Sequence, residues 1–390
     1  MNNGTAGRIL KYIQDQQDDL IELLKHMVDA ESPSATPQAH RLIIAVLTEA
    51  LTSLDFRVRI PQASNSHKHI FARRDKRRRD SPAQLLVGHY DTVWPLGTTA
   101  KRPFTIDGNI IRGPGVFDMK GGLAQIVFAL KALQELDLPM PLEPVIFFNS
   151  DEEIGSRSST RYVRALAKSV ERAYVLEPSL GEEGVIKTER KGIGRFTVTV
   201  HGKAAHAGLD PEGGASAILE LSHVIQALFA LNDPDKGITI NVGTIDGGLQ
   251  PNVIAPHSQA VVDVRVPTIA DGERIEETIL TLKPTTPGVR LTVEGGIGRP
   301  SMEQTPRNKA LWERAESLGK ELGLELQQGR AGGGSDGNTT SQYTATLDGL
   351  GPVGHGAHAE HEFLYLDKTL ERTALFALLL LLPPIEGSLP

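Results

Sequence analysis

Acidic and imidazole side chains follow three short apolar runs of this sequence, and each run is typical of a buried strand. The runs and the groups behind them are 85–88 before His89 and Asp91, 145–149 before Asp151, Glu152 and Glu153, and 173–176 before Glu177. Functional groups are expected where strands end, because loops at a sheet edge rest on a rigid base. The chain has no cysteine, so a tight metal site must use histidine and carboxylate ligands.

His89 and Asp91 are two residues apart, and residues with that spacing on a strand point to the same side. A metal-bound imidazole uses one nitrogen for the metal, and a carboxylate at the other nitrogen fixes the tautomer. A metal ligand with its orienting partner is therefore one interpretation. The other is a buried histidine that is satisfied by the neighbouring aspartate.

Glu152 and Glu153 are adjacent, so their carboxylates point apart in extended structure and can serve different purposes. One can bind a metal while the other accepts a proton from a water molecule that the metal has acidified. The simpler alternative for this pair is a solvated acidic turn. Asp118 could instead be the N-cap of the following helix, and Glu177 could be an ordinary surface residue. The placement of all these groups at successive strand ends favours one shared site.

The C-terminal part of the chain adds histidines and a glycine-rich segment. His355, His358 and His361 are spaced three apart, which fits either a helical cluster or a loop from which one histidine reaches a metal. Flanking glycines favour the loop. Residues 332–334 lack the Gly-Lys-Ser/Thr ending of a phosphate loop, so we expect Gly333 to line a wall of the substrate site.

Strands and helices alternate along the first half of the chain, which predicts an α/β sheet with helices on both faces. Helical spacing covers 9–29, 39–54 and 123–133, while 56–60 and 69–72 resemble paired strands. Residues 192–302 differ, because their order of strand, helix, strand, strand, helix, strand is that of a split βαβ unit. We expect a catalytic domain formed by 1–191 and 303–390, with an α+β domain inserted at 192–302.

Bulk properties limit the functions further. The chain has 390 residues, which is too many for one ordinary hydrophobic core, so two domains are expected. Its net charge of −7 gives no reason to expect nucleic-acid binding. The basic run 73–79 fits a solvated hairpin turn, and the apolar run within 373–382 fits a final buried helix, too short to span a bilayer. The polar N-terminus does not resemble a signal peptide. A soluble, cytoplasmic protein without nucleic-acid or membrane partners is expected.

These motifs together resemble the M20 family of metallopeptidases and deacylases, in family order over nearly the whole chain. The matching stretches are 88–93, 113–122, 151–156, 177–178, 202–208, 252–256, and His358 with Glu362 and Phe363. Residues 92–97, Thr-Val-Trp-Pro-Leu-Gly, are most similar to the glutamate carboxypeptidases of that family. The resemblance implies a zinc-exopeptidase-like catalytic domain with a central mixed sheet, and an inserted ferredoxin-like lid and dimerisation domain.

The resemblance also implies two zinc ions per subunit, about 3.5 Å apart, for which cobalt or manganese can substitute. The peptide bond after Asp118 would be cis, as is usual at this family position. The ligands would be Asp118 as the bridge, His89 and Glu177 at one ion, and Glu153 and His358 at the other.

Two further residues, Asp91 and Glu152, take roles that the same resemblance implies. Asp91 would orient His89, and Glu152 would act as general base and carry a proton to the leaving amine. His361 competes with His358 for the last ligand position. The pattern Ala-His-x-x-x-Glu-Phe favours His358.

The inserted domain would supply substrate-binding groups and a dimer contact. His206 resembles the family's transition-state histidine, often donated by a partner subunit, which would make a homodimer functionally necessary. Asn252 and Arg265 keep the family spacing, and Arg265 could hold the substrate's free carboxylate as a fork. Arg299 matches an arginine that reads the glutamate side chain in folate-cleaving relatives. The lysine that those relatives use after the Glu-Pro motif has no clear match, because Lys187 is offset.

We therefore expect hydrolysis of the amide bond to a C-terminal amino acid in a small N-acyl amino acid or peptide-like substrate. A deacylase of the acetylornithine or succinyl-diaminopimelate type, with an identical metal core, is the first alternative. A catalytically inactive binding protein on the same fold is the second. Retention of Glu152 together with every expected ligand argues against it.

Overall fold

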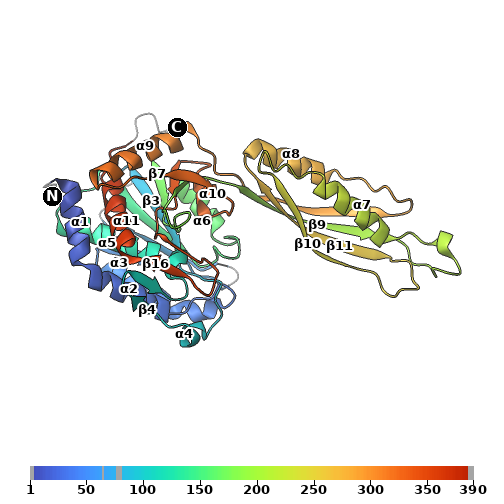
Figure 1. The fold of residues 1–390 in the computed structure, drawn as a ribbon, viewed down its shortest axis with the longest axis horizontal. Helices are drawn as coiled ribbons and strands as arrows, with labels where there is room; N and C mark the ends of the chain where they lie inside the picture. The colour runs from blue at the N-terminus through green and yellow to red at the C-terminus, as the bar shows by residue number, and fades with distance from the viewer. Residues whose placement is uncertain (1–3, 64–65, 76–80, 385–390) are drawn as a thin grey trace. The chain divides into compact units, whose positions relative to one another are not determined.

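The computed structural model describes residues 4–63, 66–75 and 81–384 (Figure 1). The chain divides into two compact units. Unit 1 comprises 1–188, 304–330 and 335–390, and unit 2 comprises 189–303 and 331–334. Unit 2 therefore contains the expected insertion 192–302, with a few more residues at each end and the short separate segment 331–334. Most of the basic run 73–79, for which we expected a hairpin turn, lies outside the described residues.

Unit 1 is built on an eight-stranded mixed sheet in the order β1-β2-β6-β3-β7-β14-β8-β13. Its strands are β1 Phe56–Arg59, β2 Ile70–Arg74, β3 Ala83–His89, β6 Glu143–Asn149, β7 Arg172–Val175, β8 Ile186–Arg190, β13 Gln328–Ala331 and β14 Ala345–Asp348. The central strands β6, β3, β7 and β14 are parallel to one another. The expected pairing of 56–60 with 69–72 is confirmed as the antiparallel pair of β1 and β2.

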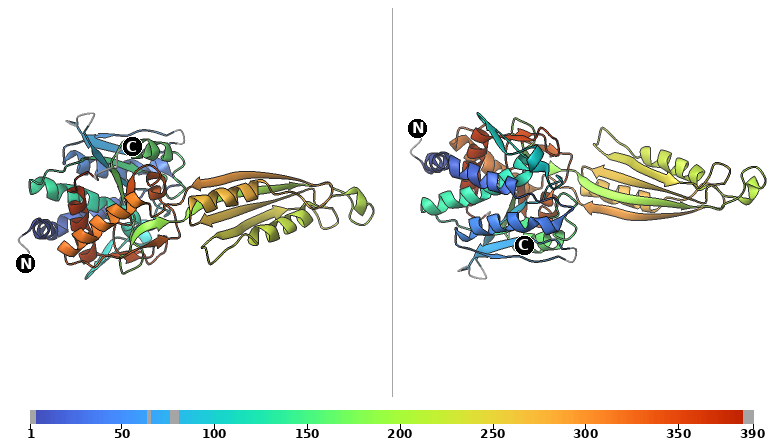
Figure 2. Two further views of the ribbon diagram at one scale, coloured as in Figure 1. Left: turned by 90° about the horizontal axis from the view of Figure 1, so that it is seen from above. Right: turned by 90° about the horizontal axis from the view of Figure 1, so that it is seen from below.

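Both faces of this sheet are buried because neighbouring residues of each central strand point to opposite sides. In β3, Leu86 joins one apolar cluster while Leu85 and Val87 join another. Helices α1 Thr5–Asp15, α2 Gln17–Asp29, α3 Arg41–Thr52, α5 Gly121–Glu135, α9 Pro306–Glu321 and α11 Leu366–Leu380 contribute to the first cluster. Helix α6 Thr160–Ala167 covers the other face, with α10 Asp336–Thr340 beside it. The expected α/β class is confirmed (Figures 1 and 2).

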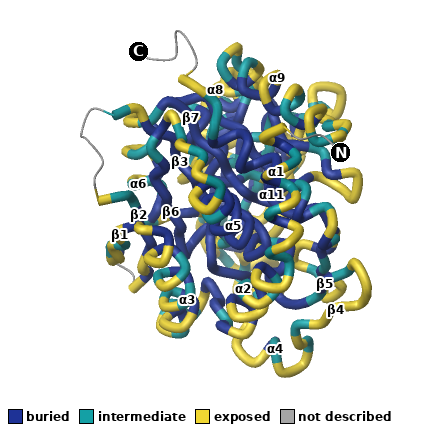
Figure 3. Tube along the Cα trace, turned by 90° about the vertical axis from the view of Figure 1, so that its left-hand side faces the viewer, coloured by how far each residue is buried: buried dark blue, intermediate teal, exposed yellow. Residues whose placement is uncertain are grey.

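Helix boundaries differ from the expectation at the N-terminus. Residues 9–29 were expected as one helix, but α1 and α2 are separated at Gln16, whose φ of −100° and ψ of 17° leave the helical region. The break lets Ile9 and Ile13 of α1 and Leu20 of α2 all reach the main core. Helix α5 runs through the middle of that core and is buried nearly all round (Figure 3).

A smaller antiparallel sheet in unit 1 has the order β15-β16-β5-β4. Its strands are β4 Thr105–Asp107, β5 Ile110–Arg112, β15 Gly354–His355 and β16 Phe363–Tyr365. The pairing of His355 with Phe363 makes residues 356–362 the connection of a hairpin. A helical cluster of His355, His358 and His361 is therefore ruled out, and the loop alternative is correct.

Unit 2 is a four-stranded antiparallel sheet in the order β10-β11-β9-β12, with both helices on one face (Figure 2). Its elements follow the chain as β9 Gly192–His201, α7 Ala217–Phe229, β10 Thr239–Gly247, β11 His257–Val266, α8 Ile269–Leu280 and β12 Arg290–Arg299. Alternate residues of β9, beginning with Phe196 and Val198, pack beneath the helices. The ferredoxin-like order is as expected, although β12 extends well beyond 290–293. No helix in the described ranges is long and apolar enough to cross a membrane.

Candidate metal centre

Parallel strands and one close helix contact bring the acidic groups of unit 1 together. Strand β3 ends at His89, and the chain leaves β6 toward Glu152 and β7 toward Glu177. The start of α5 lies against this edge because Gly122 has no side chain. A Cβ at that position would stand 2.0 Å from the carbonyl oxygen of Leu176. The turn that precedes α5 thereby presents Asp118 to the strand ends.

Asp118 stands between two histidines and directs a different oxygen at each. Its Oδ1 lies 3.2 Å from Nε2 of His89, and its Oδ2 lies 3.5 Å from Nε2 of His358. Glu177 Oε1 is 3.4 Å from the same nitrogen of His89. Glu153 Oε2 is 2.8 Å from Nε2 of His358. Two clusters of ligand atoms therefore share one carboxylate, and the peptide bond after Asp118 is cis, as the resemblance implied.

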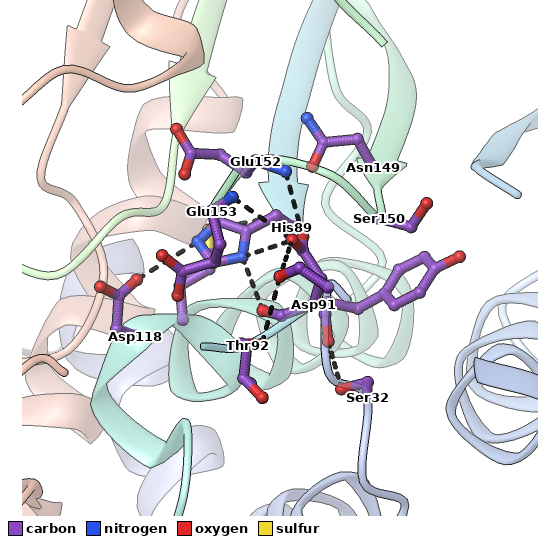
Figure 4. Close-up of polar contacts among 12 residues, drawn as sticks. Ser32, His89, Asp91, Thr92, Asp118, Asn149, Ser150, Glu152 and Glu153 are labelled. Atoms are coloured by element: carbon purple, nitrogen blue, oxygen red, sulfur yellow. Dashed lines mark hydrogen bonds and ion pairs between the residues drawn. The ribbon is translucent and has the colours of Figure 1, made fainter. Parts of the chain in front are cut away.

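Asp91 holds His89 mainly through its backbone. The Nδ1 atom of His89 lies 3.0 Å from the carbonyl oxygen of Asp91 and 3.5 Å from its carboxylate. The carboxylate instead accepts hydrogen bonds from the hydroxyl of Ser34 at 2.7 Å and from the N–H groups of Glu152 and Glu153 at 3.2 and 3.3 Å (Figure 4). An Nδ1–H that donates to the carbonyl leaves Nε2 of His89 available as a ligand atom.

Burial and neighbouring charges shift the pKa values in this cluster. Burial lowers the pKa of His89, but three neighbouring carboxylates, led by Asp118, raise it well above its usual value. Hydrogen bonds to Asp118 and Glu153 raise the pKa of the half-exposed His358 to about 10. Burial raises the pKa of Glu153 to about 8. The raised pKa values of the two histidines therefore reflect the carboxylates that surround them.

The residues fit a divalent metal. The Oε1 atom of Glu153 is buried and has no hydrogen-bond partner among the described residues, as expected of an atom shaped to contact an ion. His89, Asp118 and Glu153 offer ligand atoms that all lie within 4.8 Å of one another, and so do His89, Glu152 and Glu177. Imidazole and carboxylate donors without thiolates suit zinc, cobalt or manganese.

Binding of a divalent metal at pH 7 is expected to release protons. The pKa values of His89, His358 and Glu153 are raised, which favours their protonated forms, whereas a metal binds neutral imidazole and ionised carboxylate. The apparent affinity should therefore increase with pH as these protons are lost. Calorimetric titration of the metal-free protein, in buffers of different ionisation enthalpy, measures the number released. His358→Ala should release fewer protons, while the exposed His26→Ala should match the wild type. Equal heats in all buffers would contradict the expectation.

His361 does not take the place of His358. Its Nε2 lies 3.3 Å from Nδ1 of His355, and the two rings stack with an interplanar angle of 18°. His358 has a positive φ of 61°, which turns its side chain away from this pair and toward Asp118. The hairpin connection thus separates the two histidines that the sequence left in competition.

One buried carboxylate that supports the site has no signal of that role in the sequence. Asp336, at the start of α10, is buried and accepts hydrogen bonds from Nδ2 of Asn149 and, at 2.7 Å, from Oγ of Ser156. These two residues flank the turn that carries Glu152 and Glu153. A Ser-Asp pair after glycines signals a helix start, but nothing in the sequence links it to a turn about 180 residues earlier.

The remaining sequence-predicted residues lie in unit 2. His206 is exposed, and its Nδ1 accepts hydrogen bonds from the N–H groups of Gly208 and Leu209 at 3.1 and 3.2 Å. The carbonyl oxygen of Asn252 accepts from the N–H of Ala207 at 3.0 Å.

Three more of these residues are those that the sequence predicts to bind substrate. The Nε and Nη2 atoms of Arg265 are paired with the carboxylate of Asp263 at 2.8 and 3.1 Å. Arg299 ends β12 and is 9% exposed. The carbonyl oxygen of Gly333 accepts from Nη1 of Arg190 at 3.1 Å.

Comparison with known proteins assigns the class. Residues 85–382, which include every candidate metal ligand, match the model of peptidase family M20/M25/M40. The chain belongs to this family of metal-dependent carboxypeptidases and amidohydrolases.

Individual relatives carry more particular names. The chain is 31% identical to carboxypeptidase G2 of a Pseudomonas species over 71% of this chain and 68% of the relative. It is 30% identical to acetylornithine deacetylase of Myxococcus xanthus over 52% and 54% of the two chains.

Solved structures support the fold. Aminopeptidase PepT of Bacillus cereus superposes with a TM-score of 0.74 at 22% identity, covering 93% of this chain and 98% of that one. A dinuclear metal-binding peptidase of the M20 family from Bacillus subtilis has a TM-score of 0.65 at 15% identity, covering 94% and 98%. At these identities the likeness establishes the architecture alone.

Proposed function

We propose that this protein is a dinuclear zinc hydrolase that cleaves the amide bond to a C-terminal amino acid. The observation that carries the proposal is the position of Asp118, whose two carboxylate oxygens face His89 and His358 separately. A carboxylate in that position is suited to bridge two ions. The similarity to a carboxypeptidase supports the reaction class.

The proposed ligands divide around this bridge. His89 and Glu177 would hold one ion, because they meet at 3.4 Å, and Glu153 and His358 the other, because they meet at 2.8 Å. Cobalt or manganese could replace zinc at such a donor set. When bound, the metal pair supplies Lewis acidity that polarises a carbonyl group and lowers the pKa of a water molecule.

Glu152 is the proposed general base. Its backbone N–H is held by Asp91, and an oxygen of its carboxylate lies within 4.8 Å of ligand atoms of His89 and Glu177. Because Glu153 contacts His358, the carboxylate of Glu152 is the one assigned to proton transfer. It would accept a proton from the attacking water and donate it to the nitrogen of the leaving amino acid.

His206 is proposed to stabilise the developing oxyanion. Two N–H groups donate to its Nδ1, so a neutral ring carries its proton on Nε2 and can donate it to an oxygen. Asn252 and Gly333 are proposed to line the same substrate site. Arg265 would bind the substrate's free carboxylate through the edge formed by Nη1 and Nη2, because Asp263 occupies the edge formed by Nε and Nη2.

Arg299 is proposed to recognise a glutamate side chain. Arg299→Ala is expected to lower kcat/KM for an N-acyl-glutamate by roughly 10- to 100-fold relative to an N-acyl-alanine, since a charge-assisted hydrogen bond is lost. A purely structural effect would lower both values together. A panel of N-acyl amino acids varied at the C-terminal residue measures the ratio. Arg274→Ala, at an exposed arginine of α8, is the control. An unchanged ratio in Arg299→Ala would rule out this role.

The same panel separates the alternative function. A deacylase of the acetylornithine or succinyl-diaminopimelate type would use the same metal ligands but accept only a small acyl group. The relative named acetylornithine deacetylase favours keeping this candidate. Turnover of acetylornithine or succinyl-diaminopimelate above that of every N-acyl-glutamate would favour the deacylase.

A homodimer through unit 2 is also proposed. Strand β10 is an edge of its sheet, and apolar side chains are exposed on it and on the neighbouring α7. These residues are Ile218, Leu219, Phe229 and Ile245, and Ile245 is 67% exposed. An unpaired edge beside exposed apolar groups favours isologous pairing with a second copy.

Ile245→Asp is expected to convert the dimer to a monomer, because it places a charge at the proposed contact. Sedimentation velocity measures the change. Leu42→Asp is the matched control, since Leu42 is 65% exposed but belongs to unit 1. If Ile245→Asp sediments as the wild-type dimer does, the contact lies elsewhere.

A further inference from the structure

Two loops that are far apart in the sequence and that carry candidate metal ligands are joined by hydrogen bonds. One is the hairpin connection 356–362, which carries His358, and the other is the turn 115–118, which ends at Asp118. The connection closes tightly at Gly356, where φ is 88° and a Cβ would stand 2.9 Å from Cα of Glu362. This closure directs the side chain of Glu362 into the protein.

The carboxylate of Glu362 joins the two loops. It is 2% exposed and accepts hydrogen bonds from three backbone N–H groups: Gly115 at 2.8 Å, Phe117 at 3.0 Å and Asp118 at 3.0 Å. A fourth donor is Nε1 of Trp94 at 3.1 Å. Each carboxylate oxygen receives two of these bonds, and the bonded residues are up to 268 positions away.

The turn needs such an acceptor because its backbone is irregular. Gly115 has a left-handed φ of 76°, and Asp118 has φ of −116° and ψ of 99°, so neither continues a helix. The buried N–H groups of this segment would cost free energy without partners. A carboxylate offers acceptor sites only, which matches a set of donors only.

We propose that Glu362 is a positioning residue of the metal centre. It fixes the N–H of Asp118, and therefore the direction of the carboxylate that faces His89 and His358. It also ties the His358 loop to that turn, because Glu362 and His358 belong to the same hairpin connection. Its role is to set the spacing between the two proposed metal sites. This inference therefore rests on the proposed function, which requires both sites.

Glu362→Gln changes this contact with little change in size. One end of the amide becomes an NH₂ group that faces N–H donors, so two of the four hydrogen bonds are replaced by opposed donors. Loss of a group that orients metal ligands lowers metal affinity by about 10- to 100-fold. We expect a loss of that size, together with an altered environment of the metal that Asp118 and His358 share.

The test is a cobalt titration of the metal-free full-length protein against a competing chelator, read by the visible absorption of bound cobalt. Wild-type protein that binds two equivalents supports the proposed function, and wild-type protein that binds none contradicts that function itself. With two equivalents in the wild type, Glu362→Gln is expected to show weakened binding and a shifted spectrum. Thermal unfolding of the metal-free variant, followed by circular dichroism, verifies the fold.

Two matched variants complete the experiment. Glu360→Gln makes the same substitution at an exposed position of the same connection and should bind cobalt as the wild type does. Glu362→Asp retains the charge on a shorter side chain, so it should fold and show an intermediate loss of cobalt affinity. If Glu362→Gln unfolds, Glu362→Asp takes its place in the titration. Wild-type affinity and spectrum in the folded Glu362 variants would overturn the inference.

Discussion

Glu152→Gln is expected to lower kcat by about 10²- to 10⁴-fold, the usual contribution of a general base, while the metal content stays unchanged. The physical reason is that the amide cannot accept a proton from water, although it keeps the size and most contacts of the carboxylate. The N–H of residue 152 would still donate to Asp91, so the turn should keep its shape. The measurement is kcat with saturating substrate, alongside metal analysis of the same sample.

The two possible roles of Glu152 give different results in this experiment. If Glu152→Gln loses a metal ion, Glu152 is a ligand. Its carboxylate is close enough for that role, because ligand atoms of His89, Glu152 and Glu177 all lie within 4.8 Å of one another. If the metal is retained and turnover is undiminished, the base is another group. Glu183→Gln, at an exposed glutamate in the same unit, controls for loss of a negative charge.

Asp118→Asn is expected to reduce bound zinc from two ions to one or fewer and to lower kcat/KM by more than about 10³-fold. An amide has one oxygen, so it cannot direct a negatively charged oxygen at each of His89 and His358 as Asp118 does. Loss of the bridge should therefore affect both proposed sites, unlike Glu177→Gln, which should weaken one. Metal analysis after gel filtration gives the stoichiometry.

The control for that prediction is Asp107→Asn, at an exposed aspartate of β4 in the same unit. It should retain wild-type stoichiometry and activity. Two tightly bound ions in Asp118→Asn would show that Asp118 is not the bridge. Addition of excess zinc to the assay distinguishes weakened binding from a lost site, because weakened sites regain activity as zinc increases.

The sequence by itself predicted the donor groups of the candidate centre and the elements that carry them. His89 and Glu177 each directly follow an apolar run, Glu153 lies just beyond another, and these runs are the parallel strands β3, β7 and β6. Local pattern is sufficient here because the carboxyl ends of parallel strands meet at one edge of a sheet. The order of elements in 192–302 similarly predicted the antiparallel sheet of unit 2.

Local pattern failed where a choice depended on packing. Residues 9–29 carry continuous helical spacing, yet the chain breaks at Gln16 so that both halves reach the core. The choice between His358 and His361 also depends on the hairpin of β15 and β16, which places His361 against His355. Spacing alone is the same in both arrangements.

Only the tertiary structure decided how the ligands are held. The sequence suggested the carboxylate of Asp91 as the partner of His89, but the closer contact is the carbonyl oxygen, and the carboxylate supports the turn of Glu152. Ser34, Asp336 and Glu362 contact residues between 57 and 268 positions away. Hydrogen bonds over such separations depend on where folding places each backbone N–H, and that placement leaves no local signal in the sequence.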